Sequence, residues 1–442
     1  MNQFVLLSLI FFSQSTTDTS WYSLYLMGNK VGYTQVIREE QKNGYRIGEI
    51  TYMNVKMLGT SKTVLLKSNY FTDGDFKMKK FDFEMSTQDQ QLKGAGFIKG
   101  DTLFVNYSSS SGAPIEKKMF IQGDLFSETT LRMFLEKKKP TKVSCSIFDV
   151  ATATLQDAIC ELEESKNGLL KYKLNSQGTT STLLLKNGRF EREEGPMGIV
   201  VQRETKSSSQ ELGTEIDITE LYAVKPNKKI EATSYLKLKV AGNISGLNFN
   251  LGPQKVIEKG NNFVILEINK DHAKCSSLVI PDSVKVYLEP DPYVQSDSKD
   301  IQMLAKSITG KIQDPCKKVA AINEWLKGNI VKAPSVTVPT ALDVIRERRG
   351  DCNEHAVLFT ALARASGIPA DIVAGLIYQD GAYYYHAWAM VYIGNKWVFV
   401  DPIFNEFPAS LNHIAMTRGS LEKQSEIMQA AGSLKILVEA QK

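Results

Sequence analysis

The chain has 442 residues, which at roughly 150 residues per domain corresponds to about three domains. Hydrophobic residues make up 43% and charged residues 23%, as in ordinary globular proteins. The net charge is only +4, from 53 basic and 49 acidic side chains, and no stripe of Lys and Arg with interleaved aromatics is present. This balance gives no support for a nucleic-acid partner.

The N-terminus has the features of an export signal. Phe4 to Phe12 is almost wholly apolar, and Ser13 and Ser15 are small residues at the two positions that a signal peptidase reads. We therefore predict a signal peptide over residues 1–15 and an extracytoplasmic location, either periplasmic or secreted. The alternative is a buried N-terminal strand. No other apolar run reaches the roughly 18 residues that a membrane span needs, so no integral membrane segment is expected after cleavage.

Residues 20–225 are predicted to form a β-rich antiparallel domain. Phe81, Phe83 and Met85 alternate with charged residues, which is the period of a half-buried strand. Turn dipeptides such as Asn43-Gly44 and Asn187-Gly188 fall between apolar runs. Few helices interrupt this pattern, and a helix from Glu128 to Lys137 is one expected exception. Such a sheet is compatible with either a ligand-holding half-barrel or a plain structural domain.

A small β module is predicted over residues 226–292. It follows a linker-like stretch, Pro226-Asn227-Lys228-Lys229. Leu236, Leu238 and Val240 alternate as in a strand, and residues 263–268 give a second strand. The module is expected to end near Pro290-Asp291-Pro292.

Residues 293–420 change to an α+β pattern. A helix should begin with Pro315 in its first turn, and shorter helices are expected at residues 340–349 and 356–366. Strands follow at residues 372–378, 387–393 and 396–400. Residues 421–442 are predicted to be a C-terminal tail, whose end could form a final strand. The predicted fold class is therefore multidomain α+β.

Three short segments of this last domain contain residues typical of a thiol nucleophile site. Cys352 is predicted in the first turn of a helix, where unpaired N–H groups would lower the thiol pKa and could stabilise an oxyanion. His386 is the best candidate for the base that takes the thiol proton. Asp401 follows one hairpin later, within reach of the far imidazole nitrogen.

The same residues allow other assignments. A metal site built from Cys352, His355, His386 and Asp401 is chemically feasible, but no Cys-x-x-Cys or His-x-x-x-His spacing supports it. His355 follows Cys352 by one turn, so it is assigned to the helix surface or to packing. His272 and His413 have no identifiable partners in the sequence.

These segments together resemble the transglutaminase-like superfamily of papain-type cysteine enzymes. The resemblance rests on Gly350 to Ala356, Gly367 to Ala370, His386 to Trp388, and Trp397 to Pro402. It covers roughly residues 300–420. It implies a Cys352, His386 and Asp401 triad and acyl transfer through a thioester. The β-rich N-terminal part with its signal resembles exported bacterial members.

Two features associated with the family are not found. The nearest Trp upstream of the nucleophile is Trp325, so the second oxyanion donor is unassigned. No EF-hand loop is present, and calcium-dependent crosslinking therefore gains no support. No cofactor is expected.

The predicted function is that of a cysteine hydrolase or acyltransferase that cleaves an amide or isopeptide bond in a protein or peptide. Water is the favoured acceptor, since nothing specifies an amine site. One alternative is a protein-crosslinking transglutaminase. The other is a non-catalytic binding protein with a vestigial triad. The three residues Tyr383, Tyr384 and Tyr385 either wall the cleft or pack in the core.

The other four cysteines are Cys145, Cys160, Cys275 and Cys316. Cys145 and Cys160 flank a polar stretch that could turn back on itself, so they are the best candidate disulfide pair in an oxidising compartment. The alternative is four buried thiols.

Overall fold

The computed structural model describes residues 17–57, 59–88, 90–109, 114–176, 179–270, 280–333, 340–419, 427, 430 and 432–442. The predicted signal peptide, His272 and Cys275 lie outside the described residues. Every helix within those ranges is too short or too polar to cross a bilayer.

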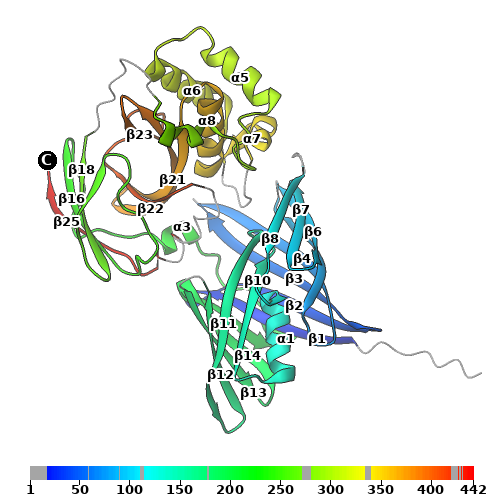
Figure 1. Ribbon diagram of the computed structural model, residues 1–442. Coiled ribbons are helices and arrows are strands. Elements are labelled where there is room, and N and C mark those ends of the chain that lie inside the picture. The colour runs from blue at the N-terminus through cyan, green and yellow to red at the C-terminus, as the bar shows by residue number, and fades with distance from the viewer. Residues whose placement is uncertain are drawn as a thin grey trace, which may run out of the picture.

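A single 15-stranded sheet occupies the first half of the chain (Figure 1). Strands β1 to β8 form one antiparallel meander and β10 to β15 another, and the two join where β1 pairs with β15. Strand β9 adds to β10 in parallel at the far edge. The strands are β1 (Thr17–Leu26), β2 (Asn29–Gln41), β3 (Gly44–Met57), β4 (Thr60–Thr72), β5 (Met78–Ser86), β6 (Gln91–Lys99), β7 (Thr102–Ser109), β8 (Ile115–Phe120), β9 (Asp124–Phe126), β10 (Lys142–Asp149), β11 (Thr154–Lys166), β12 (Leu169–Ser176), β13 (Thr179–Lys186), β14 (Arg189–Glu194) and β15 (Ile199–Glu204).

Along strand β5, buried apolar side chains alternate with more exposed ones, so one face of the sheet packs on a core. Phe81, Phe83 and Met85 of β5 are buried, as their spacing predicts. Asn187 and Gly188 both have positive φ, 52° and 77°, in the two-residue turn between β13 and β14. Such turns match the twist of the strands that they connect.

Helix α1 (Glu128–Lys138) packs in the concave side of this sheet (Figure 1). Its residues Leu131 and Leu135 are fully buried, and Ser127 closes a capping box at its start. The buried Arg132 pairs with Glu193 of β14 at 2.7 Å. The predicted helix is therefore confirmed.

A connecting segment with short helices leads out of the large sheet. It contains α2 (Lys206–Gln210) and α3 (Ile218–Leu221), after a 3-10 turn η1 (Pro196–Gly198) between β14 and β15. Val224 then pairs with Tyr383 through two backbone hydrogen bonds of 2.8 Å. The connection therefore contacts the C-terminal part of the chain before the small β module begins.

The small β module is a four-stranded sheet in the order β17-β18-β16-β25. Its strands are β16 (Tyr235–Ala241), β17 (Gln254–Lys259), β18 (Phe263–Asn269) and β25 (Lys435–Gln441). Strand β25 pairs antiparallel with β16. The end of the predicted C-terminal tail is thus part of this sheet, some 200 residues away in sequence from its partner strand.

The mixed domain, which the sequence predicts over residues 293–420, combines helices with a four-stranded sheet in the order β23-β22-β21-β24. A turn with α4 (Asp282–Lys285) and η2 (Val286–Leu288) precedes it. Its elements are α5 (Lys299–Thr309), α6 (Pro315–Asn329), β19 (Val331–Lys332), α7 (Ala341–Glu347), β20 (Arg349–Gly350), α8 (Cys352–Ala365), β21 (Ala370–Gln379), β22 (Ala382–Ile393), β23 (Lys396–Val400) and β24 (His413–Arg418). The predicted α+β class is confirmed.

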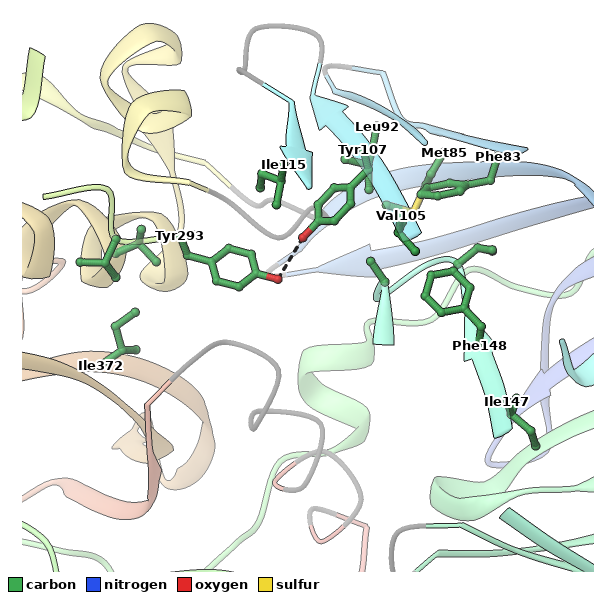
Figure 2. Packing of buried hydrophobic residues seen from close by; sticks show 14 of the residues in the cluster. Phe83, Met85, Leu92, Val105, Tyr107, Ile115, Ile147, Phe148, Tyr293 and Ile372 are labelled. Atoms are coloured by element: carbon green, nitrogen blue, oxygen red, sulfur yellow. Dashed lines mark hydrogen bonds between the residues drawn. The ribbon is translucent and has the colours of Figure 1, made fainter. Parts of the chain in front are cut away.

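The modules share buried cores. Leu236 and Leu238 of the small sheet lie in one cluster with Leu376 and Ile414 of the mixed domain. A larger cluster runs from the 15-stranded sheet into α5, α6 and α8. Figure 2 shows its crossing point, where the hydroxyls of Tyr107 and Tyr293 form a buried hydrogen bond of 3.1 Å.

Candidate active site

Cys352 is the first residue of α8, in the position that the sequence predicts. Asp351 is the N-cap, and its carboxylate accepts a hydrogen bond from the N–H of Asn353. The carboxylate of Glu354 accepts in turn from the N–H of Asp351 at 2.9 Å. This capping box determines where the helix begins and therefore where the thiol is presented.

The sulfur of Cys352 lies against β22. The backbone N–H of Ala387, the residue after His386, donates a hydrogen bond to it. Tyr385, on the other side of His386, contacts the same helix end, because its hydroxyl donates to Asn353 Oδ1 at 3.4 Å. The nucleophile candidate and the strand that carries the base candidate are thus in contact.

His386 and Asp401 form a short hydrogen bond. His386 Nε2 and Asp401 Oδ2 are 2.7 Å apart, and both side chains are buried. The pairing of β22 with β23 brings them together, since Ala389 is opposite Val400 and Asp401 follows directly. Because an ionised carboxylate only accepts, Nε2 of His386 donates the proton of this hydrogen bond.

A direct hydrogen bond between the Cys352 thiol and His386 is not among the contacts of these described residues. The link runs instead through the Ala387 N–H. Hydrogen bonds between catalytic groups are often long or poorly aligned in the absence of substrate. The lack of a direct Cys352–His386 hydrogen bond is therefore compatible with proton transfer once substrate is bound.

Asp401 is held by its own loop as well as by histidine. Its Oδ1 accepts from the N–H groups of Ile403 and Phe404, at 3.1 and 3.3 Å. Its backbone pairs with Glu406 through hydrogen bonds of 3.0 and 2.9 Å. Burial alone would raise the pKa of Asp401, but the charge of His386 and hydrogen bonds from two imidazoles hold it well below the usual range.

His413 is the second imidazole, and the sequence offered no partner for it. Its Nε2 lies 2.8 Å from the same Oδ2 of Asp401, and its Nδ1 lies 3.0 Å from the carbonyl oxygen of Ser410. His386 and His413 belong to the two strands that flank β21, opposite Gly375 and Ile377 respectively. Only the strand order of this sheet reveals that they meet.

The surroundings of Cys352 do not lower its pKa as predicted from the helix end. Burial raises the pKa of the thiol well above its ordinary value, and the charges of Asp351, Glu354 and Asp401 add to this effect. The Ala387 N–H acts in the opposite direction. Burial of the thiol has the largest effect, and the capping carboxylates at the start of α8 add negative charge beside the sulfur.

His355 packs inside the domain and is not on the helix surface. It is 1% exposed, and its Nδ1 lies 2.7 Å from the carbonyl oxygen of Asp351. Burial lowers its pKa, in spite of that hydrogen bond. Its partner is the backbone of its own helix start, which agrees with the packing role predicted for it.

The three tyrosines before His386 have different surroundings. Tyr383 is fully buried and pairs through its backbone with Val224. The hydroxyl of Tyr384 donates to Glu220 of α3 at 3.1 Å. Tyr385 alone lies beside the nucleophile candidate.

Cys352, His355, His386 and Asp401 do not form a metal site together among the described residues. Among the described residues, the side chains with mutual distances compatible with an ion are His386, Asp401 and His413, whose ligand atoms lie within 4.8 Å. Cys352 and His355 are not part of that group. Both imidazole contacts to Asp401 have hydrogen-bond lengths, so we interpret the cluster as a proton-sharing one.

The predicted pairing of Cys145 with Cys160 is wrong. Both cysteines are free and buried, on adjacent strands where Cys145 is opposite Ala158. Residues in such a diagonal position are too far apart for a disulfide without backbone movement. Cys316, in contrast, is disulfide-bonded.

Comparison with known proteins confirms the resemblance for one segment. Residues 302–402 match the family model described as "Transglutaminase-like superfamily". An uncharacterized protein of Haemophilus influenzae is 32% identical over 98 residues, which cover 21% of this chain and 26% of the relative. The chain therefore spans about a quarter of that curated relative's length.

Two solved structures are similar at low TM-scores. One, described as a candidate cysteine protease from Cytophaga hutchinsonii, has a TM-score of 0.32 and 20% identity, and the match covers 47% of this chain and 89% of that one. The other is the periplasmic domain of TgpA from Pseudomonas aeruginosa, with a TM-score of 0.32, 16% identity, and coverage of 41% and 75%. Neither likeness assigns a function.

Proposed function

We propose that the mixed domain is a transglutaminase-like cysteine hydrolase that cleaves an amide or isopeptide bond in a protein or peptide. The observation that carries this proposal is the position of Cys352 at the start of α8, against β22. His386 lies on that same strand and forms a hydrogen bond of 2.7 Å with Asp401, which follows β23. The family match over residues 302–402 supports the same class of chemistry.

In the proposed reaction, His386 Nδ1 takes the thiol proton as the sulfur of Cys352 attacks the substrate carbonyl carbon. The Cys352 N–H, free at the first turn of α8, stabilises the negative oxygen of the tetrahedral intermediate. The carbon–nitrogen bond then breaks, and His386 gives its proton to the leaving amine. Water, deprotonated by His386, attacks the thioester, which releases a carboxylic acid and restores the thiol.

Export to an oxidising compartment is part of the proposal. It is supported by the disulfide at Cys316, since such bonds are rare in cytosolic proteins. It is also supported by the apolar sequence from Phe4 to Phe12.

The proposal is tested by incubating the purified full-length chain with a peptide library derived from a whole proteome and identifying new termini by mass spectrometry. The Cys352→Ala variant should give no products, whereas Cys145→Ala, which removes a buried thiol of the large sheet, should retain them. An unselective set of products that is identical in wild type and Cys352→Ala would contradict the proposal.

A labelled primary amine in the same incubation separates hydrolysis from crosslinking. New acid termini without label support hydrolysis. Label attached to substrate carbonyl groups, again lost in Cys352→Ala, would instead assign the alternative of an amine acceptor.

A further inference from the structure

We propose that Lys332 and Phe404 bind a carboxylate of the peptide substrate beside the bond that Cys352 attacks. Phe404 supplies an apolar surface, and Lys332 supplies the opposite charge. The carboxylate comes from an acidic side chain or from the C-terminus of the peptide. This inference rests on the proposed function, because it names a substrate class for the same site.

The ring of Phe404 is held beside the candidate base. Phe404 lies three residues after Asp401, and its backbone N–H donates to Asp401 Oδ1 at 3.3 Å. Its ring centre is 5.6 Å from that of His386, and its side chain is 40% exposed. Single exposed apolar side chains are common on proteins, so exposure alone has little meaning. Here the carboxylate that orients His386 also fixes the backbone of Phe404, so the ring forms part of the surface that a substrate at Cys352 meets.

Lys332 is tied to the segment that leads into the nucleophile. It belongs to β19 and is opposite Gly350 of β20, which lies two residues before Cys352. The N–H of Ala333 donates to the Gly350 carbonyl oxygen at 2.9 Å. The Lys332 ammonium lies 5.1 Å from the centre of the Phe404 ring, within the range of a cation–π contact. The start of α8 and the loop after β23 therefore position the cation and the ring together.

The surroundings of Lys332 suit an anionic ligand. The side chain is exposed, and its contact among the described residues is with the face of an aromatic ring and not with a carboxylate. An ammonium group has three donors, and a ring face covers only part of it. Because the proposed substrate is a peptide or protein, the anion that it offers is a carboxylate.

The charge of Lys332 opposes the negative charge near the sulfur. Burial raises the pKa of the Cys352 thiol most, and the capping carboxylates Asp351 and Glu354 add to this effect. The same carboxylates repel an anionic substrate. Lys332 has the opposite sign, and its charge adds to burial in lowering the pKa of His355 on α8. Removal of Lys332 therefore leaves the capping carboxylates to disfavour a bound carboxylate.

Alkylation of Cys352 with a charged and an uncharged reagent tests the cation without any substrate. Iodoacetate is an anion and iodoacetamide is its neutral analogue, so the ratio of their rates reports the charge around the sulfur. Dividing the two rates within each protein removes any effect of a substitution on the thiol itself. The ratio of iodoacetate to iodoacetamide should fall about two- to fivefold in Lys332→Met, which keeps an unbranched side chain but removes the charge. Lys332→Arg, which keeps the charge, should retain the ratio.

The matched control is Lys186→Met, at an exposed lysine of β13 in the large sheet. This variant should leave the ratio of the two rates unchanged. An equal ratio in wild type and Lys332→Met would overturn the inference. An equal fall in both Met variants would also overturn it, because the effect would then come from the net charge of the protein.

Peptide pairs identify the source of the carboxylate. Sequences that the wild-type protein cleaves are synthesised with Glu or Gln on either side of the scissile bond, and with a free acid or an amide at the C-terminus. A higher kcat/KM for Glu than for Gln assigns an acidic side chain, and a higher value for the free acid assigns the C-terminus. Either preference should act through KM and should shrink about two- to fivefold in Lys332→Met. The absence of both preferences, or a preference that Lys332→Met leaves intact, would contradict the role of Lys332.

Failure of the proposed function gives a different pattern. If wild type and Cys352→Ala give the same products from the peptide library, the hydrolase proposal is rejected, and the inference is rejected with it. If cleavage requires Cys352 but neither the reagent ratio nor the peptide preference depends on Lys332, the hydrolase proposal stands and only the role of Lys332 is rejected.

Discussion

Asp401 is the residue on which the candidate site depends most, because its two oxygens accept four hydrogen bonds. His386 and His413 donate to Oδ2, and the N–H groups of Ile403 and Phe404 donate to Oδ1. The carboxylate therefore orients the base and fixes the turn after β23 at the same time.

Asp401→Asn should destabilise the protein by about 1–3 kcal/mol. The amide NH2 of Asn would replace one of the two accepting oxygens, so N–H groups that now donate to that oxygen would face another donor. Asp297, which is exposed, provides the matched control Asp297→Asn, for which no change is expected. Urea unfolding of both variants measures the difference. Equal stability of the two variants would contradict the hydrogen-bond assignments at Asp401.

The His413 to Asp401 pair also predicts how stability depends on pH. Folding raises the pKa of His413, so its contribution is full below the unfolded value of about 6.5 and is lost as pH rises through the folded value. Folding lowers the pKa of Asp401, whose contribution is present above its unfolded value and is lost in acid.

Thermal unfolding between pH 6 and pH 9 checks the histidine part. Wild type should lose stability with rising pH over that range, and His413→Gln should show a flatter profile. The prediction fails if both proteins have parallel profiles.

At the residue scale, sequence reasoning succeeded where contacts are local and failed where they are not. Cys352 at a helix start, and His386 one hairpin from Asp401, follow from short-range patterns. His413 belongs to β24, whose place beside β21 depends on tertiary pairing. The direction of the Cys352 pKa shift does not follow from the helix end alone, because its largest cause is burial of the thiol, which depends on the folded domain.

At the scale of elements, the start of α8 is controlled by Gly350. A methyl group on Gly350 would overlap the side chain of Glu354, which completes the capping box. The reason for glycine is therefore space, since Gly350 is not among the residues of positive φ.

Gly350→Ala should cost about 1–2 kcal/mol through loss of the cap and should slow alkylation of Cys352. Gly328→Ala is the matched control, because that position lies in α6 with open space around it. It should be neutral or stabilising, since Ala favours helix. Chemical unfolding compares the two, and similar losses at both positions would contradict the role of Gly350.

Helices and strands with strong periodicity were found in the sequence, with boundaries shifted by a few residues. Residues 356–365, expected to be helical from their periodicity, belong to a helix that begins at Cys352, as expected for the nucleophile, because the capping box starts it there. The predicted Cys145 to Cys160 disulfide failed because the hairpin register leaves the two cysteines diagonal to each other. Register depends on pairing across strands, which a single strand's pattern does not contain.

At the scale of the whole molecule, the three modules are joined by buried contacts and not only by linkers. The hydrogen bond between Tyr107 of β7 and Tyr293 crosses from the large sheet to the mixed domain (Figure 2). Lys117 lies over both rings, at 5.6 and 5.3 Å. We therefore expect the large sheet and the mixed domain to influence each other's stability.

A double-mutant cycle tests this coupling. Tyr293→Phe should destabilise the protein by about 1 kcal/mol because the buried Tyr107 hydroxyl loses this partner. Adding Tyr107→Phe should restore much of that loss, giving a coupling of at least about 0.5 kcal/mol. Additive losses would show that the hydroxyls act independently.

The broad organisation could be predicted from composition shifts and turn residues, whereas the closure of the sheets could not. Hairpin signals indicate an antiparallel domain, but they do not predict that β1 pairs with β15. The paired residues Leu26 and Ile199 lie far apart in the sequence. Likewise, a strand is expected at the end of the chain, but its pairing with β16 depends on the folded domain between them.

The central claim, that His386 activates Cys352, is tested most directly by the rate of Cys352 alkylation with iodoacetamide, followed by mass spectrometry from pH 5 to pH 9. At pH 7.5, wild type should react at least about ten times faster than His386→Ala, since a positioned base typically contributes on the order of 10²–10⁴. The buried Cys145 and Cys160 should stay unmodified. Equal rates for Cys352 in the two proteins would contradict the account.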